Sequence, residues 1–480
     1  MNDRKGFGSN FGFLMAAVGS AVGLGNIWGF PNKMGANGGF PFLILYLALA
    51  LCCGVIIMLG ELALGRKTGH GAVGAYQSIS KRFKWLGWLG IAAAALIFSF
   101  YSALGGYCLR YVVVNFGNLI GAEFGTNGVG GADVFQGLLS QPDVSIAFAL
   151  AFMLITMLVV MSGVGGGIER VCSVGMPALF FILIICIIRS CTLPGAADGL
   201  KYMFVPGWAV ANGIIDEAPG FWRVLTAAGG QMFFSLSLGA GVMITYGSYL
   251  DKKQDLGKSA MIIVGMDTVV ALMAGLCVIP GRFALDPNGA LGGPELLFIT
   301  MQNVFDKMGP AGPVFGILFY LLVFFAAISS SISMLVVIVA HFCDKAREKG
   351  KGDRRKLYSA IAVVICAALC ALVCADGMGS NHISPAELLG LAGAKLPGWS
   401  TSWLGLFDSV AEGLLMPLGA LLMCLMISWE LKPDALRQEI LLNGENRPWV
   451  YDFFRLCVKY ITPLCMLMIL YGQISDFFIA

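Results

Sequence analysis

Long apolar stretches separated by short polar segments run through the whole chain. Four windows carry no Asp, Glu, Lys or Arg, at residues 34–60, 85–109, 144–168 and 224–250. A helix needs about 20 apolar residues to cross the hydrocarbon core of a bilayer, and every one of these windows is longer. The pattern predicts eleven membrane-spanning helices, at about residues 11–36, 40–66, 86–116, 144–163, 169–190, 221–250, 258–284, 313–343, 357–376, 408–430 and 449–475. A short helical loop is expected at residues 294–298, before the eighth span.

The composition leaves no room for a large soluble domain. Of the 480 residues 12% are charged and 58% are hydrophobic, whereas soluble domains carry about 25% charged residues. We therefore expect an all-α polytopic membrane protein, one transporter-sized domain over residues 1–480, lying in a lipid bilayer. The net charge of +3 gives no reason to expect a nucleic-acid partner. The 14 cysteines lie mostly in apolar runs and the three histidines lack ligand spacing, so no zinc-type site is expected.

The placement of basic residues predicts the orientation. Of the 31 lysines and arginines, 21 fall at residues 4–5, 66–84, 170, 252–258, 345–356 and 432–447, which are alternate loops. Residues 115–145 carry three acids and no Lys or Arg. By the positive-inside rule the N-terminus is cytoplasmic, and eleven spans then place the C-terminus on the other side. The first span continues past Pro31 without a cleavage site, so we expect a retained helix and no signal peptide.

Two spans contain residues that break helices. The first holds Gly19, Gly23, Gly25, Asn26 and Pro31, and the sixth holds Gly229, Gly230, Gly239 and Gly241 around Ser235 and Ser237. Non-helical backbone at membrane depth is tolerated only where it is buried in protein or lines a cavity. The two spans are five apart, as in transporters built from inverted repeats. Gly19-x-x-x-Gly23 is also a helix-packing motif, but the matched second interruption favours the transporter. We expect inverted halves at residues 9–190 and 221–430, followed by an eleventh helix at 449–475.

Four short strings carry a family resemblance. They are GSAVGLGNIWGFP at residues 19–31, SFYS at 99–102, QMFFSLSLG at 231–239 and FAAISSS at 325–331. They resemble the signatures of the neurotransmitter:sodium symporter family, and the likeness runs from about residue 4 to residue 475. It implies sodium-coupled uptake of amino acids by alternating access, and no enzymatic activity. Eleven helices are typical of some prokaryotic members, which suggests a bacterial plasma membrane.

The resemblance implies two sodium sites. Na⁺ is a hard cation that prefers oxygen ligands. The first site would use the Ala21 carbonyl, Asn26, Ser235 and Asp267, together with the substrate carboxylate. The second would use the carbonyls of Gly19, Val22 and Ala326 and the hydroxyls of Ser329 and Ser330. Helix-packing hydroxyls that bond back to their own helix are the alternative for the serines.

Asp267 is the only acid in the seventh predicted span. An ionisable residue there is costly and marks a functional site by default, although a structural ion pair is an alternative. Many family members have asparagine at this position and a chloride nearby, and this chain has Ala271 one turn later. We therefore expect Asp267 to supply the negative charge, and chloride not to be required. Glu61, the other buried acid, is read as structural or proton-linked.

The substrate pocket follows from the same resemblance. The opening at Gly23, Leu24 and Gly25 exposes N–H groups and a positive helix end, which suit a carboxylate, and Tyr101 would donate to the same group. Carbonyls near Phe234, Ser235 and Ser330 suit an ammonium. The side-chain pocket would be lined by Ser20, Ala21, Ile97, Phe234, Ser237, Ala240 and Met334. Ala240 is phenylalanine in the bacterial leucine transporter, so we expect large hydrophobic or aromatic L-amino acids.

The cytoplasmic gate is implied by five residues near the ends of spans. Arg4 and Asp344 match the family's ion pair. Phe7 stands where tryptophan is usual, and Ser248 and Tyr249 fit the residues that hold the pair.

The outer gate departs from the family pattern. Its acid is either Asp408 or Glu412, and the sequence does not separate them. The usual arginine is replaced by Gly29. Lys33 lies four residues on, on the same face of a resumed helix. It either replaces the lost cation or is a solvated vestibule lysine.

Other functions fit less well. A transporter of the same fold driven by protons, or one carrying an osmolyte, is the main alternative. A membrane enzyme would need a nucleophile or a metal beside Glu61 and Asp267, and a channel would need repeated filter residues. A nutrient sensor that binds without transport is a further alternative.

Overall fold

The computed structural model describes residues 9–126, 128–391, 397–441 and 448–478, and across these ranges the chain is helical with no strand. Nine continuous helical segments in them are long and apolar enough to cross a membrane. A tenth crossing is a pair bent by 44°, Phe11–Ala21 and Gly25–Ala36. The predicted sixth span is broken into two pieces that are each too short to cross alone. The eleven predicted spans therefore all correspond to helices.

The spans are built from the following elements: α1 (Asn10–Ala21), α2 (Phe30–Ala36), α3 (Phe40–Leu49), α4 (Val55–Thr68), α6 (Lys84–Ile120), α8 (Pro142–Met161), α9 (Arg170–Cys191), α12 (Phe221–Leu236), α13 (Val242–Gly247), α14 (Leu256–Leu285), α16 (Gly312–Glu348), α17 (Arg355–Asp376), α19 (Trp403–Asp408), α20 (Met416–Leu425), α22 (Pro448–Leu456) and α23 (Thr462–Phe478). Short π-helical segments join several of them, among them η1 (Gly25–Gly29) and η9 (Ser409–Leu415). Such wide turns are frequent at functional sites.

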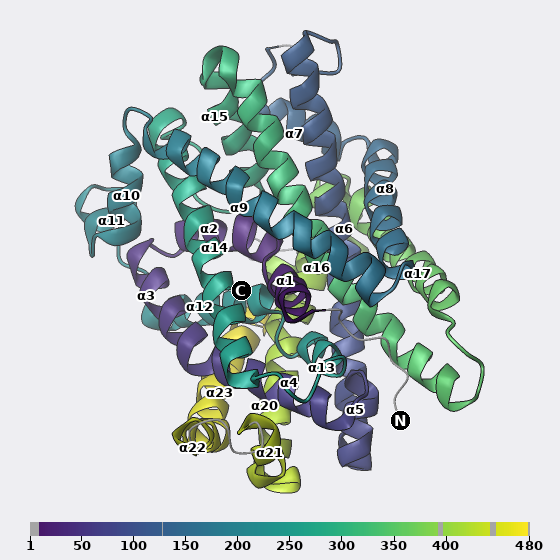
Figure 1. The fold of residues 1–480 in the computed structure, drawn as a ribbon. Coiled ribbons are helices and arrows are strands. Elements are labelled where there is room, and N and C mark those ends of the chain that lie inside the picture. The colour runs from purple at the N-terminus through teal and green to yellow at the C-terminus, as the bar shows by residue number, and fades with distance from the viewer. Residues whose placement is uncertain (1–8, 127, 392–396, 442–447, 479–480) are drawn as a thin grey trace.

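The loops carry short helices, most of which the apolar pattern did not predict. They are α5 (Ala72–Ile79), α7 (Gly131–Leu139), α10 (Ala196–Phe204), α11 (Trp208–Ala211), α15 (Met301–Lys307), α18 (Pro385–Leu388) and α21 (Arg437–Ile440). The short helical loop expected before the eighth span is confirmed by η5 (Leu296–Thr300) and α15. Figure 1 shows α7 and α15 at one end of the molecule and α5, α21 and α22 at the other. We refer to these as the α15 end and the α5 end.

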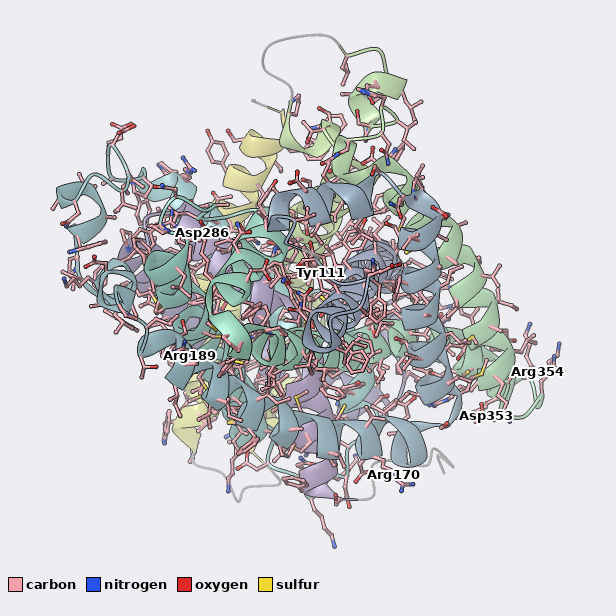
Figure 2. The ribbon with its side chains drawn as sticks, turned by 90° about the horizontal axis from the view of Figure 1, so that it is seen from above. Tyr111, Arg170, Arg189, Asp286, Asp353 and Arg354 are labelled. Atoms are coloured by element: carbon pink, nitrogen blue, oxygen red, sulfur yellow. The ribbon has the colours of Figure 1, made fainter. Side chains whose placement is uncertain are left out.

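Burial separates central from peripheral helices. In the most apolar window of the span that contains α16, 89% of the residues are buried, and the corresponding value for α6 is 78%. The value falls to 33% for α8 and α17 and to 28% for the span of α9. Figure 2 places Tyr111 among the central helices and the charged Asp353 and Arg354 at the rim. The apolar surface of the outer helices suits lipid contact, since lipid tails are as apolar as the side chains.

The two broken spans meet at the centre. α1 ends at Ala21, and the helix resumes at Gly25 after two bends. In the sixth span the backbone between α12 and α13 turns through left-handed conformations at Ser237 (φ 53°), Gly239 (φ 79°) and Gly241 (φ 73°). Such a conformation costs a residue other than glycine about 1–3 kcal/mol. The Ser237 hydroxyl donates to the Ser20 carbonyl at 3.1 Å, which joins the two breaks.

Candidate functional site

A buried polar cluster surrounds Asp267 of α14. The Asn26 side-chain amide donates to its carboxylate at 2.8 Å and to its backbone carbonyl at 2.9 Å. The Ser235 hydroxyl donates to the same carboxylate at 2.9 Å. Asp267, Asn26 and Ser235 are completely buried. The structure thus brings together the three side chains predicted for the first sodium site, and Ala21, the last residue of α1, is buried with them.

Tyr46 of α3 also belongs to this cluster, and the sequence analysis missed it. Its hydroxyl donates to the Asp267 carboxylate at 3.3 Å. A polar atom inside an otherwise apolar span was the only available signal. The cluster holds a single carboxylate, and among the described residues no three His, Cys, Asp or Glu side chains gather to hold a metal ion. An oxygen-rich site of low charge suits an alkali cation rather than a transition metal.

A second cluster joins the break of the first span to α16. The Ser329 hydroxyl lies 3.3 Å from the Val22 carbonyl and 2.9 Å from the Ala326 carbonyl. The Ser330 hydroxyl lies 3.4 Å from the carbonyls of Gly19 and Val22 and 3.2 Å from that of Ser20. All five oxygens predicted for the second sodium site are therefore neighbours. A hydroxyl can rotate to present its lone pairs to a cation.

The first helix break also meets Tyr101 of α6. The Leu24 backbone N–H donates to the Tyr101 hydroxyl at 2.7 Å. A side chain at Gly23 would collide here, because an added Cβ would lie 2.2 Å from the Ser330 Oγ and 2.4 Å from the Tyr101 hydroxyl. Gly25 is similarly close to Phe234 and Ser235. Backbone donors, a tyrosine hydroxyl and serine oxygens thus face one small region.

The residues predicted to line the side-chain pocket are buried around this region. They are Ser20, Ala21, Ile97, Phe234, Ser237, Ala240 and Met334. The rings of Tyr101 and Phe234 lie 6.4 Å apart, and those of Phe100 and Phe234 stack at 6.5 Å. The Ser20 hydroxyl is buried without a hydrogen-bond partner. Leaving such a group unpaired costs about 1–3 kcal/mol, so it is available for a ligand.

Glu61 of α4 contacts the second helix break. One of its carboxylate oxygens accepts from the Gly239 N–H at 2.7 Å, and the other has no hydrogen-bond partner. Glu61 is buried, at 1% exposure. The contact places this acid at the hinge between α12 and α13, beside the left-handed Gly239.

At the α5 end, Arg4 and Phe7 of the predicted gate lie outside the described residues. Asp344 accepts a hydrogen bond from the Gly71 N–H at 3.2 Å, at the start of α5. Among the described residues, the Ser248 hydroxyl contacts the Thr245 carbonyl, and the Tyr249 hydroxyl accepts from Arg355.

At the α15 end, Lys33 forms an ion pair with Glu412 of η9. The side chains are 22% and 8% exposed, so neither is fully solvated. Asp408 lies one turn earlier and interacts with both groups. Gly29, at the position of the missing arginine, faces Gln231, whose amide donates to the Gly25 carbonyl at 2.6 Å. The structure therefore selects Glu412 as the partner of Lys33.

The comparisons with known proteins agree with this geometry. A profile of the sodium:neurotransmitter symporter family matches residues 4–127 and 132–478. The chain belongs to this family. Membership makes it a sodium-coupled solute transporter of the membrane, not an enzyme. The sodium-dependent transporter YhdH of Bacillus subtilis is 36% identical over 477 residues, which cover 97% of each chain.

Two further relatives extend the family likeness. The sodium-dependent transporter MJ1319 of Methanocaldococcus jannaschii is 29% identical over 99% of this chain and 91% of its own length. A crystal structure of MhsT in complex with L-phenylalanine superposes with a TM-score of 0.83 at 34% identity. It covers 98% of this chain and 100% of that one, so the symporter fold extends over the whole chain.

Proposed function

We propose that this symporter carries large hydrophobic or aromatic L-amino acids together with two sodium ions. The observation that carries the proposal is the Leu24 N–H and Tyr101 hydroxyl pair, 2.7 Å apart, next to the break of the first span. Both groups can turn to a substrate carboxylate, and the exposed helix end adds a positive field. The MhsT structure, of the same fold, holds L-phenylalanine.

The pocket walls support the size preference. Ala240 removes bulk where a phenylalanine would otherwise stand, and Met334 adapts to ligands of different shape. The rings of Phe100 and Phe234 add an apolar surface, against which an aromatic side chain packs well. The unpaired Ser20 hydroxyl offers a polar contact to the ligand.

The two oxygen clusters support the coupling to sodium. An ion at the Asp267 cluster touches the substrate carboxylate, so each stabilises binding of the other. An ion at the Ser329 cluster ties the first span to α16. This is reciprocal linkage, in which sodium and amino acid raise each other's affinity by the same factor. Because Asp267 brings its own negative charge and Ala271 offers no ligand, chloride is not part of the proposed cycle.

The proposed setting is a bacterial plasma membrane with a cytoplasmic N-terminus, since basic residues gather in the loops of the α5 end. Residues 9–190 and 221–430 form the two inverted halves, and 449–475 the added helix. The α5 end then carries the inner gate, with Asp344, and the α15 end carries the outer gate, with Lys33 and Glu412.

Thermal stabilisation of the purified protein tests the proposal. Each of the twenty amino acids is added in NaCl, in sodium gluconate and in KCl. We expect a few large hydrophobic amino acids to stabilise the protein in both sodium salts and not in KCl. Stabilisation in KCl would point to a proton-driven carrier instead, and stabilisation in NaCl alone would show that chloride is required. Sodium-driven uptake into proteoliposomes then separates a transporter from a sensor.

A further inference from the structure

The eleventh helix touches the outer ion pair. α23 packs so closely on α12 that a Cβ added at Gly472 would lie 2.0 Å from the Thr226 hydroxyl. The next residue, Gln473, donates from its side-chain amide to the Thr226 carbonyl at 3.3 Å. The close approach of the two helices and this bond fix where the Gln473 side chain points.

Gln473 points toward Glu412 and Lys33. A Cβ added at Gly230 would lie 2.7 Å from Glu412 Oε1, 2.8 Å from Gln473 Nε2 and 3.6 Å from Lys33 Nζ. The other amide atom, Gln473 Oε1, would lie 3.2 Å from a Cβ added at Gly413, the residue after Glu412. The amide therefore fills the space between α12 and η9, beside the carboxylate. Glycine at 230 leaves room for this meeting of three side chains.

The chemistry gives the amide a task. An arginine presents a planar fork of donors that fixes a carboxylate in two directions, whereas a lysine is a single flexible point charge. This chain has Gly29 at the arginine position and depends on Lys33. A neighbouring amide whose donor is already oriented can supply the missing direction. Glu412 is mostly buried, so its orientation decides how well the ion pair forms.

We propose that Gln473 is a positioning residue of the outer gate, which holds Glu412 in place for Lys33. The eleventh helix, which lies outside the two inverted halves, would then take part in closing the outer path. The inference rests on the proposed transport function, because the gate has meaning only if a substrate is released past it.

A double-mutant cycle tests the link to Glu412. Q473M keeps the length of the side chain and removes both polar atoms. Wild-type binding of a labelled amino acid in sodium comes first, and its absence would refute the proposed function. Where binding is present, the rate of release to the outer medium is measured in proteoliposomes. We expect Q473M to speed release about fivefold, the usual effect of one net hydrogen bond, and to have no further effect in E412Q.

A cation placed at 473 gives a second, independent readout. K33Q removes the lysine and should speed release. Q473K in the K33Q background should slow it again, because the new ammonium lies beside the same carboxylate. Q136K, which adds the same charge at an exposed glutamine of α7, is the matched control and should not restore slow release.

Two results would overturn the inference while leaving transport intact. One is an equal effect of Q473M in the wild-type and E412Q backgrounds, which would make Gln473 a packing residue. The other is equal rescue by Q473K and Q136K, or rescue by neither. Melting temperatures of all variants show whether each is folded, and Q473N replaces Q473M if the latter is unstable.

Discussion

The Asn26 side chain donates a hydrogen bond of 2.8 Å to the carboxylate of Asp267, although 241 positions separate the two residues. The same asparagine accepts from the Gly23 N–H at 2.9 Å through its other side-chain atom. One side chain thus connects the broken first helix to the only carboxylate of α14. Any change in the charge of Asp267 is expected to reach the helix break directly.

Removing the charge of Asp267 should create a need for chloride. In D267N the amide keeps the size of the side chain, but a sodium ion at the cluster loses its only carboxylate ligand. We expect sodium affinity in gluconate to fall by about tenfold or more, the equivalent of ~1.4 kcal/mol. Chloride should restore part of it. Sodium titrations followed by thermal stability in gluconate and in chloride measure both effects.

The control for this variant is D198N, which removes an exposed acid that pairs with Lys201 on α10. It should leave both sodium titrations unchanged. Equal sodium affinity of D267N and wild type in gluconate would show that Asp267 does not bind the ion.

Three consecutive serines of α16 should differ sharply in their effect on sodium binding. Ser329 and Ser330 face the carbonyls of the first span, whereas Ser331 bonds to Thr156 of α8 at 2.8 Å. S329A and S330A should lower sodium affinity by about threefold to thirtyfold each, since each loses one oxygen ligand. S331A should retain wild-type affinity. Sodium-dependent binding of a labelled amino acid measures the difference, and an equal loss in all three variants would indicate a packing effect.

A graded series at Ala240 should narrow the pocket. A240V, A240L and A240F add increasing volume to a residue that is 2% exposed in the apo protein. We expect the preference to move from Trp and Tyr toward Leu and then Ala as volume increases, because each added methylene excludes part of the largest ligands. Competition of the four amino acids against one labelled substrate gives the order. An unchanged order across the three variants would mean that Ala240 does not set the size limit.

Asp306, in the loop before α16, should make stability depend on pH. Burial raises the pKa of its carboxyl above the usual 3.8, and a hydrogen bond from Gln302 opposes part of that rise. Because the raised pKa belongs to the folded state, ionisation of Asp306 destabilises the fold as pH rises through that pKa. D306N should therefore raise the melting temperature near neutral pH and have no effect below about pH 3, where the acid is protonated in both states. A D306N effect that grows on acidification would contradict this.

Much of the fold was determined by local sequence. A run of apolar residues specifies a spanning helix wherever it stands, because the bilayer requires every backbone group to be paired within the segment. The eleven spans and the two breaks at Gly23 and Ser237 were predicted on that basis. The short loop helices were not, since helices such as α7 and α10 form by packing against neighbours rather than by apolar length.

The partners of the buried polar groups were decided by the tertiary structure alone. The sequence placed Asp408 and Glu412 one turn apart and could not choose between them. The choice of Glu412 depends on how η9 faces Lys33, 379 positions earlier in the chain. Tyr46 and Gln473 look like ordinary residues of apolar helices in the sequence. They join the sites only because helices distant in the chain pack side by side and exclude water, which requires each buried polar atom to find a partner there.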